Sequence, residues 1–303
     1  MRIQNLLFAA CLLLPMNSMA EGISKSVNNT AANSLKTQLP MAEWGTINEL
    51  TITGPLGAGD IAFISNVAKA TNNLKVLNMS GASELLEIGK GAFYGIKSLT
   101  DVSLPASVNT IADKAFMDCI NLSKITFNEG LTTISDRAFS NDSLLTSITF
   151  PASLGDLNVS ALEGCNNLEE IKVAPGSQVY SSISGVLYTM EDLTLVRYPV
   201  ARNDDNFTIP DGTTSIGDNA FANSKLLKAF EMPASVKSIG KNAFANCPGI
   251  SNIILGDGVT TVADFAFAGC VNLAGISFPK SLKTIGDGLF NRCCNITSIR
   301  CEA

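Results

Sequence analysis

Cysteine is the residue type whose spacing in this 303-residue chain most suggests chemistry. Five of the eight cysteines stand three residues after a recurring Phe or Leu: Cys119, Cys165, Cys247, Cys270 and Cys293. A thiol becomes a nucleophile where neighbouring groups favour the thiolate. The regular spacing indicates instead that these five are small buried residues, with Cys301 at an inward strand position and only Cys294 outside the pattern. Disulfides between Cys247, Cys270 and Cys293 stay open as an alternative for an exported chain.

Other catalytic groups are scarce. The chain contains no histidine, which removes Ser/His and Cys/His nucleophile systems and nearly every mixed zinc site. Adjacent carboxylates occur at Glu169–Glu170 and Asp204–Asp205, but neighbouring residues in a strand point to opposite faces and paired loop carboxylates are common solvated charges. The sequence predicts no enzyme, no catalytic residue, no cofactor and no metal site.

A repeat of 23 residues positions these side chains. Eight repeat units can be aligned on one apolar position, which is Phe in seven units and Leu in one. Consecutive units are 23 residues apart except between Leu162 and Phe221, which are 59 apart. The aligned residues are Phe93, Phe116, Phe139, Leu162, Phe221, Phe244, Phe267 and Phe290. A strict period in this range predicts a solenoid, whose units bury their apolar faces only by stacking on their neighbours.

Within a unit, alternating apolar residues such as Ile125 and Phe127 predict one half-buried strand per coil, and the coils together predict a parallel sheet. A second apolar pair, such as Val236 and Ile239, predicts a short second strand. The "AFxxCxxL" stretch predicts a helical turn or 3₁₀ segment.

The repeats divide the chain. We expect an N-terminal capping unit over residues 21–84, repeats over 85–173 and 210–303, and an insertion over 174–209 that contains a β-hairpin. In the capping unit we expect strands at 47–54 and 75–82 and a helix at 60–74. The last coil carries no cap, which suggests self-association through that coil.

Residues 1–20 have the pattern of a secretory signal peptide, with Arg2, an apolar run over 6–15 and small residues at Ser18 and Ala20. Cleavage here is favoured over lipid attachment at Cys11, and the run is too short to span a bilayer. We therefore expect a secreted or cell-surface protein without a transmembrane segment. Its net charge of −6 and its lack of a Lys/Arg cluster exclude nucleic acid as a partner.

The pattern "LxxIxLPxxVxxIxxxAFxxC" resembles the BspA-like leucine-rich repeat family of surface proteins, over about residues 85–303 apart from the insertion. The resemblance implies a right-handed leucine-rich repeat solenoid of the α/β type, built mostly of short parallel strands. It also implies a bacterial, exported protein that binds an extracellular protein or glycan in the manner of an adhesin. A structural or assembly component of the cell envelope is the alternative.

Two sets of residues are candidates for binding. The outward positions of the main strand form a polar stripe that suits an extended partner: Ser103, Thr126, Thr149, Lys172, Glu231, Ile254, Ser277 and Arg300. The insertion contributes residue types that dominate binding hot spots, as a possible ridge: Tyr180, Tyr188, Arg197 and Tyr198. For the stripe the alternative is plain solvated sheet surface, and for the insertion it is a structural excursion that packs on the solenoid.

Overall fold

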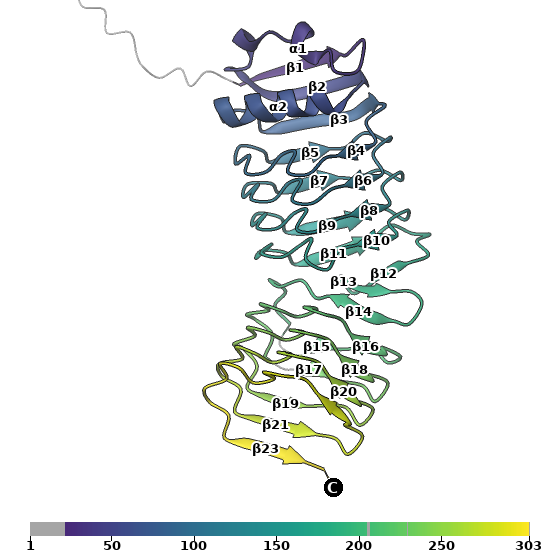
Figure 1. The fold of residues 1–303 in the computed structure, drawn as a ribbon, viewed down its shortest axis with the longest axis vertical. Helices are drawn as coiled ribbons and strands as arrows, with labels where there is room; N and C mark the ends of the chain where they lie inside the picture. Colours follow the sequence, from purple (N-terminus) through teal and green to yellow (C-terminus); the bar gives the residue numbers. More distant parts are fainter. Residues whose placement is uncertain (1–21, 205–206, 229, 303) are drawn as a thin grey trace, which may run out of the picture.

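The computed structural model describes residues 22–204, 207–228 and 230–302. The predicted signal peptide and Cys11 lie outside the described residues. The described chain is a solenoid whose coils stack along one axis, from the helix-containing unit at the purple end to β23 at the yellow end (Figure 1). The predicted solenoid is confirmed.

The N-terminal unit contains the predicted strand, helix and strand as β2 (Ile47–Pro55), α2 (Ala58–Thr71) and β3 (Val76–Ser83). Sequence analysis missed β1 (Ile23–Asn28), α1 (Leu35–Gln38) and the 3₁₀ helix η1 (Met41–Glu43). Strands β1, β2 and β3 form the start of a sheet that continues into the first repeats.

Two buried side chains hold this unit together. The carboxylate of Asp60 accepts hydrogen bonds from the backbone N–H groups of Asn33, Leu35 and Gly57. Trp44 is 1% exposed, packs edge-on against Phe63 and belongs to the core of the unit, as the sequence suggested.

Each repeat contributes a main strand and a short strand, and most neighbouring repeats pair these in parallel. The main strands are β5 (Asp101–Ser103), β7 (Lys124–Thr126), β9 (Ser147–Phe150), β11 (Glu170–Val173), β15 (Phe207–Thr208), β17 (Phe230–Glu231), β19 (Asn252–Ile254), β21 (Gly275–Phe278) and β23 (Ser298–Cys301). The short strands are β4 (Glu87–Ile88), β6 (Thr110–Ile111), β8 (Thr133–Ile134), β10 (Asp156–Leu157), β16 (Ser215–Ile216), β18 (Ser238–Ile239), β20 (Thr261–Val262) and β22 (Thr284–Ile285).

The predicted helical turn is wrong, because the described "AFxxCxxL" segments form successive tight turns. The residues two before and two after the Phe have positive φ, as at Lys114 (57°) and Asp118 (62°) around Phe116. Left-handed residues at this spacing prevent a right-handed helix from propagating. They direct alternate N–H groups to the next coil, so that Phe116 N donates to Ala138 O at 2.8 Å.

Stacked Phe rings fill the centre of the coils. Ring centroids lie 5.1 Å apart between Phe93 and Phe116 and 4.7 Å apart between Phe221 and Phe244, with nearly parallel planes. The column is interrupted near Leu162, and the buried apolar residues form two clusters that meet in β13 (Val186–Thr189), where Leu187 belongs to the first and Val186 to the second.

The segment predicted as one hairpin insertion differs in the structure. Strands β12 (Tyr180–Ile183), β13 (Val186–Thr189) and β14 (Thr194–Arg197) form an antiparallel meander with two turns. Strand β14 then pairs in parallel with β16, as a short strand does. The ring of Tyr198 stacks on Phe221 at 5.0 Å, and Tyr198 N donates to Ala220 O, so Tyr198 occupies the Phe position of a further coil.

We predict that Phe244→Ala lowers the free energy of unfolding by about 3–5 kcal/mol, because its ring is fully buried against rings on both sides. Phe290→Ala is the matched control. Phe290 is only partly buried and its nearest ring centroids lie 6.3 and 6.4 Å away, so the loss should be clearly smaller. Urea unfolding followed by circular dichroism measures both. Equal losses at the two positions would contradict the ring column as the main source of stability.

Candidate functional site

The predicted stripe lies on the outer side of the main strands. Thr126, Thr149, Lys172, Glu231 and Arg300 are exposed, Ser103 and Ser277 are partly exposed, and Ile254 is 75% exposed. Strand register places Thr126 beside Ser103, Lys172 beside Thr149, and Ser277 between Ile254 and Arg300. The structure therefore brings these side chains into short rows along the solenoid axis.

The stripe continues into the N-terminal unit, where sequence analysis did not place it. Thr51 pairs with Asn78, and Asn78 pairs with Ser103. The N-terminal unit does not share the 23-residue period. The repeat alignment that identified the outward positions elsewhere therefore could not be extended to it.

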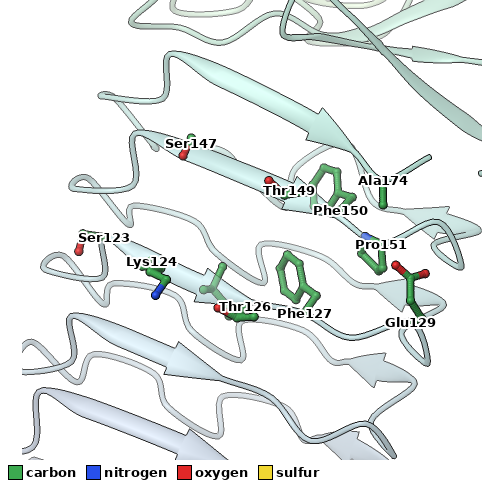
Figure 2. A pocket seen from close by; sticks show the side chains of 11 residues that line it. Ser123, Lys124, Thr126, Phe127, Glu129, Ser147, Thr149, Phe150, Pro151 and Ala174 are labelled. Atoms are coloured by element: carbon green, nitrogen blue, oxygen red, sulfur yellow. The ribbon is translucent and has the colours of Figure 1, made fainter. Parts of the chain in front are cut away.

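A groove of about 420 Å³ crosses the stripe between β7 and β9. Thr126 and Thr149 stand on its walls, and Phe127 and Phe150 lie deeper between the strands (Figure 2). The lining carries one Lys and one Glu beside several hydroxyl groups: Ser123, Lys124, Ile125, Thr126, Phe127, Glu129, Ser147, Thr149, Phe150, Pro151 and Ala174. This groove is the largest described hollow that the stripe contains.

The predicted Tyr-bearing ridge is wrong for three of its four residues. Tyr188 and Tyr198 are 0% exposed and Arg197 is 6% exposed, so a partner cannot reach them. Tyr180 is half-buried, and its hydroxyl accepts a hydrogen bond from Leu157 N at 3.2 Å. These side chains fill the junction between the two parts of the solenoid instead of projecting from it.

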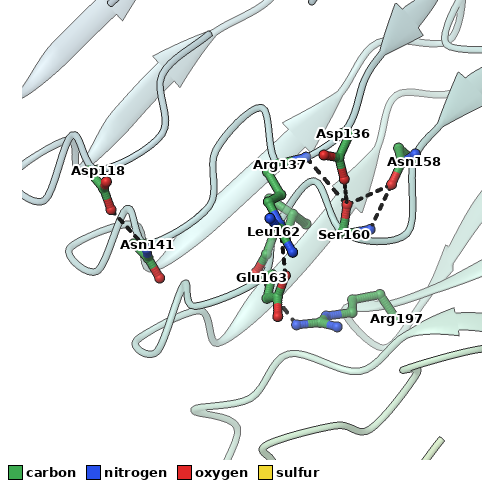
Figure 3. Close-up of polar contacts among 9 residues, drawn as sticks. All are labelled: Asp118, Asp136, Arg137, Asn141, Asn158, Ser160, Leu162, Glu163 and Arg197. Carbon is green, nitrogen blue, oxygen red and sulfur yellow. Dashed lines mark hydrogen bonds and ion pairs between the residues drawn. The ribbon is translucent and has the colours of Figure 1, made fainter. Parts of the chain in front are cut away.

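Arg197 connects the coils on the two sides of that junction. Its guanidinium donates to Asn219 O at 3.0 Å. It also donates to Leu162 O at 3.5 Å, a contact that Figure 3 shows. Leu162 stands where the Phe column is interrupted, so its carbonyl lacks the partner that a regular next coil would provide. Arg197 supplies that partner, and the nearby Glu163 forms its ion pair with Arg137 at 3.4 Å. The role of Arg197 in this structure is to join two parts of the fold.

The chain matches the model of the BspA type leucine-rich repeat region over residues 65–199 and 201–303. It belongs to this family. The described coils, built of repeated short parallel strands, agree with that assignment. No curated protein matches the chain.

Solved structures of leucine-rich repeat proteins from bacteria are similar to this family member. A leucine-rich cell surface protein of Faecalibacterium prausnitzii shares 29% identity, with 86% of this chain and 74% of that chain covered and a TM-score of 0.63. The pneumococcal vaccine antigen PcpA shares 25% identity over 84% of this chain, with a TM-score of 0.70, and the match spans 62% of that chain. A protein of Eubacterium ventriosum, at 21% identity, a TM-score of 0.61 and coverage of 82% and 78%, supports the fold alone.

The seven described cysteines of this leucine-rich repeat chain are free. Cys119, Cys165, Cys247 and Cys270 are buried, and each thiol donates to the carbonyl of the Phe 26 residues earlier, at 3.1 Å. Burial raises the pKa of Cys165 and Cys270 to about 12 and raises the pKa of the other two as well. The thiols therefore act as buried hydrogen-bond donors.

Two cysteines depart from the buried position that the repeat predicted. Cys293 is partly exposed, and Cys301 is exposed although its position corresponds to the buried Leu104. Cys301 lies on β23, which pairs only with β21 among the described strands, so no further coil covers it.

Asp142 stands at the cysteine position of its repeat and is 0% exposed. One carboxyl oxygen accepts from Cys119 N at 2.9 Å, and the other has no hydrogen-bond partner in the described structure. Burial raises the pKa of Asp142 to about 9, so the folded protein holds this group as a neutral acid at pH 7.

Within the described residues no helix is long and apolar enough to cross a bilayer, and no group of His, Cys, Asp or Glu is placed to hold a metal ion.

We predict that the stability of the protein decreases between about pH 4 and pH 9 because of Asp142. In this range the unfolded chain has released the proton at a pKa near 3.9 and the folded chain retains it, so the free energy of unfolding falls by about 1.4 kcal/mol per pH unit. Asp142→Asn should remove this contribution and stabilise the protein at pH 8. Urea unfolding at pH 5, 7 and 8 checks this, and parallel pH profiles of wild type and variant would refute it.

Thiol labelling in the native protein should separate the cysteines by burial. With a thiol reagent at pH 8, we expect fast reaction of the exposed Cys294 and Cys301, and reaction of the four buried thiols only at the rate of unfolding. Peptide mass spectrometry after timed labelling identifies each site. Fast labelling of Cys247 in the native protein would contradict the buried donor role.

Proposed function

We propose that this protein is an exported, cell-surface or secreted recognition protein that binds an extracellular protein or glycan through the stripe on its main strands, without catalysis. Membership of the BspA-type family supports a surface interaction role. The similar cell surface protein of Faecalibacterium prausnitzii and the pneumococcal vaccine antigen support an extracellular setting.

The observation that carries the proposal is the rigid order of the stripe before any partner is bound. Side chains such as Ser103 and Thr126 are held in register by backbone hydrogen bonds between coils. Their short hydroxyl side chains lose little conformational entropy when a partner covers them. A long surface of this kind supports binding by many modest contacts.

A role as a structural or assembly component of the cell envelope is the second candidate. It is favoured by Ile285 and Ile299, which are 52% and 53% exposed on neighbouring strands of the last described coil. Such exposed apolar side chains favour self-association through this coil. Concentration-dependent mass in light scattering would support this role, and a constant monomeric mass would remove it.

We predict that arginine substitutions on the stripe weaken binding to immobilised matrix proteins, mucins or glycans. Three single variants place a long, charged side chain at separate points along the stripe: Ser103→Arg, Thr149→Arg and Ser277→Arg. At least one should raise the Kd about tenfold, equivalent to about 1.4 kcal/mol, because it disrupts the shape of the contact surface.

Thr284→Arg is the matched control, since Thr284 is exposed on the short strand β22, outside the stripe. It should bind as the wild type does. Binding that survives all three stripe substitutions, or that is lost only in Thr284→Arg, would overturn the proposal that the stripe is the contact surface.

A further inference from the structure

The hydrogen-bonded series of main strands is interrupted between β7 and β9, as it also is, among the described residues, between β17 and β19. Strand β7 pairs with β5, and β9 pairs with β11, but no backbone hydrogen bond joins β7 to β9, all of whose residues the structure describes. The rest of these two coils remains joined, since β8 pairs with β10 and Phe116 N donates to Ala138 O. The coils therefore separate only on the face that carries the stripe.

The interruption leaves backbone groups of both strands without the partners that the repeat normally provides. Lys124 N donates to Thr100 O, and Thr126 O accepts from Leu104 N, so residues 124 and 126 direct their polar groups toward β5. Because alternate residues of a parallel strand point to opposite sides, Ile125 and Phe127 direct theirs toward β9. By the same register Ser147 and Thr149 face β7.

These backbone groups line the groove described above, since Ile125, Phe127, Ser147 and Thr149 are all lining residues. They offer amide donors and carbonyl acceptors from both walls. A backbone group that loses its partner away from water costs about 1–3 kcal/mol, so these groups require water or a ligand.

The floor of the groove is apolar and more open than the same position in the repeats directly before and after it. Phe127 is partly exposed, whereas the corresponding Leu104 and Phe150 are 3% and 0% exposed. Figure 2 shows the rings of Phe127 and Phe150 between the strands, with the hydroxyl groups of Thr126 and Thr149 at the walls. A ligand here meets an aromatic surface below and hydrogen-bonding groups at the sides.

The groove has no free cation among its lining residues. Its one lysine, Lys124, pairs with Asp101 at 3.3 Å, and its one carboxylate, Glu129, accepts a hydrogen bond from Ala152 N at 3.0 Å. The lining therefore offers nothing that would select an anionic ligand.

We propose that the groove between β7 and β9 binds a neutral saccharide, a choice that rests on the proposed function and names the ligand class of its site. Sugar hydroxyls both donate and accept, which suits the mixed backbone groups, and the C–H face of a sugar ring suits the floor at Phe127. Cα atoms of β7 and β9 approach within 8 Å, less than the roughly 9.6 Å that a strand inserted between them would need. The ligand of this proposal therefore lies over the groove from the stripe side and does not add a strand to the sheet.

The test uses the purified protein and four neutral disaccharides, namely maltose, cellobiose, lactose and chitobiose, with titration followed by amide NMR. We expect at least one to bind and to slow the hydrogen exchange of the Ile125, Phe127, Ser147 and Thr149 amides. Thr149→Arg should raise its Kd about tenfold, and Phe127→Leu, which keeps an apolar floor without the ring, should raise it several-fold. Thr284→Arg should leave it unchanged.

The result that overturns the inference is the absence of binding by all four disaccharides, or binding that Thr149→Arg does not weaken. Tighter binding of sialyllactose than of lactose would also overturn it, because the neutral class would then be wrong. Loss of binding to an immobilised protein in Ser277→Arg, with no saccharide bound at the groove, would refute the saccharide site and leave the proposed function standing.

Discussion

The structure depends on the stacking of each coil on the next. In each regular repeat the Phe ring packs on the ring 23 residues away, and the turn around it donates backbone hydrogen bonds to the following coil. A coil alone buries neither its ring nor its backbone groups. Each regular repeat must therefore keep the same length of 23 residues. The same constraint explains the buried cysteines, whose thiols complete the hydrogen bonding of the Phe carbonyls across the stack.

Wherever stacking is interrupted, polar groups lose their partners and the fold responds locally. At Leu162 the meander of β12, β13 and β14 fills the space, and Arg197 donates hydrogen bonds to the carbonyls of Leu162 and Asn219. Between β7 and β9 no side chain performs this role, and a groove remains. The interruption at Leu162 is closed by the protein's own residues. The interruption between β7 and β9 leaves unpaired hydrogen-bonding groups at the surface, which is the physical basis for placing a ligand there.

The repeat phase made most of the coil architecture predictable, including both strand series and the outward side of the stripe. Tyr198 shows where the same reasoning stopped: it stands 23 residues before Phe221, in phase with the column, yet its aromatic hydroxyl suggested a binding residue. The short strand before it pairs Leu195 with Ile216, a step of 21, which hid the further coil. The turn geometry was also missed, because apolar residues three apart fit a helix and a series of tight turns equally well.

The groove between β7 and β9 was not predictable from strand residues, since "KITF" and "SITF" fit the repeat equally well. The difference lies where the chain leaves each strand. After β9 it turns at Pro151, whose φ is fixed, as it does at Pro105 after β5. After β7 the same position is Asn128, whose side-chain oxygen accepts from Gly130 N at 2.8 Å and forms a local turn of its own. A Cβ on Gly130 would lie 2.5 Å from Ala106 O, so this turn packs tightly against the preceding coil. The two coils that border the groove thus differ in the turn that follows each strand, and not in the apolar residues of the strands themselves.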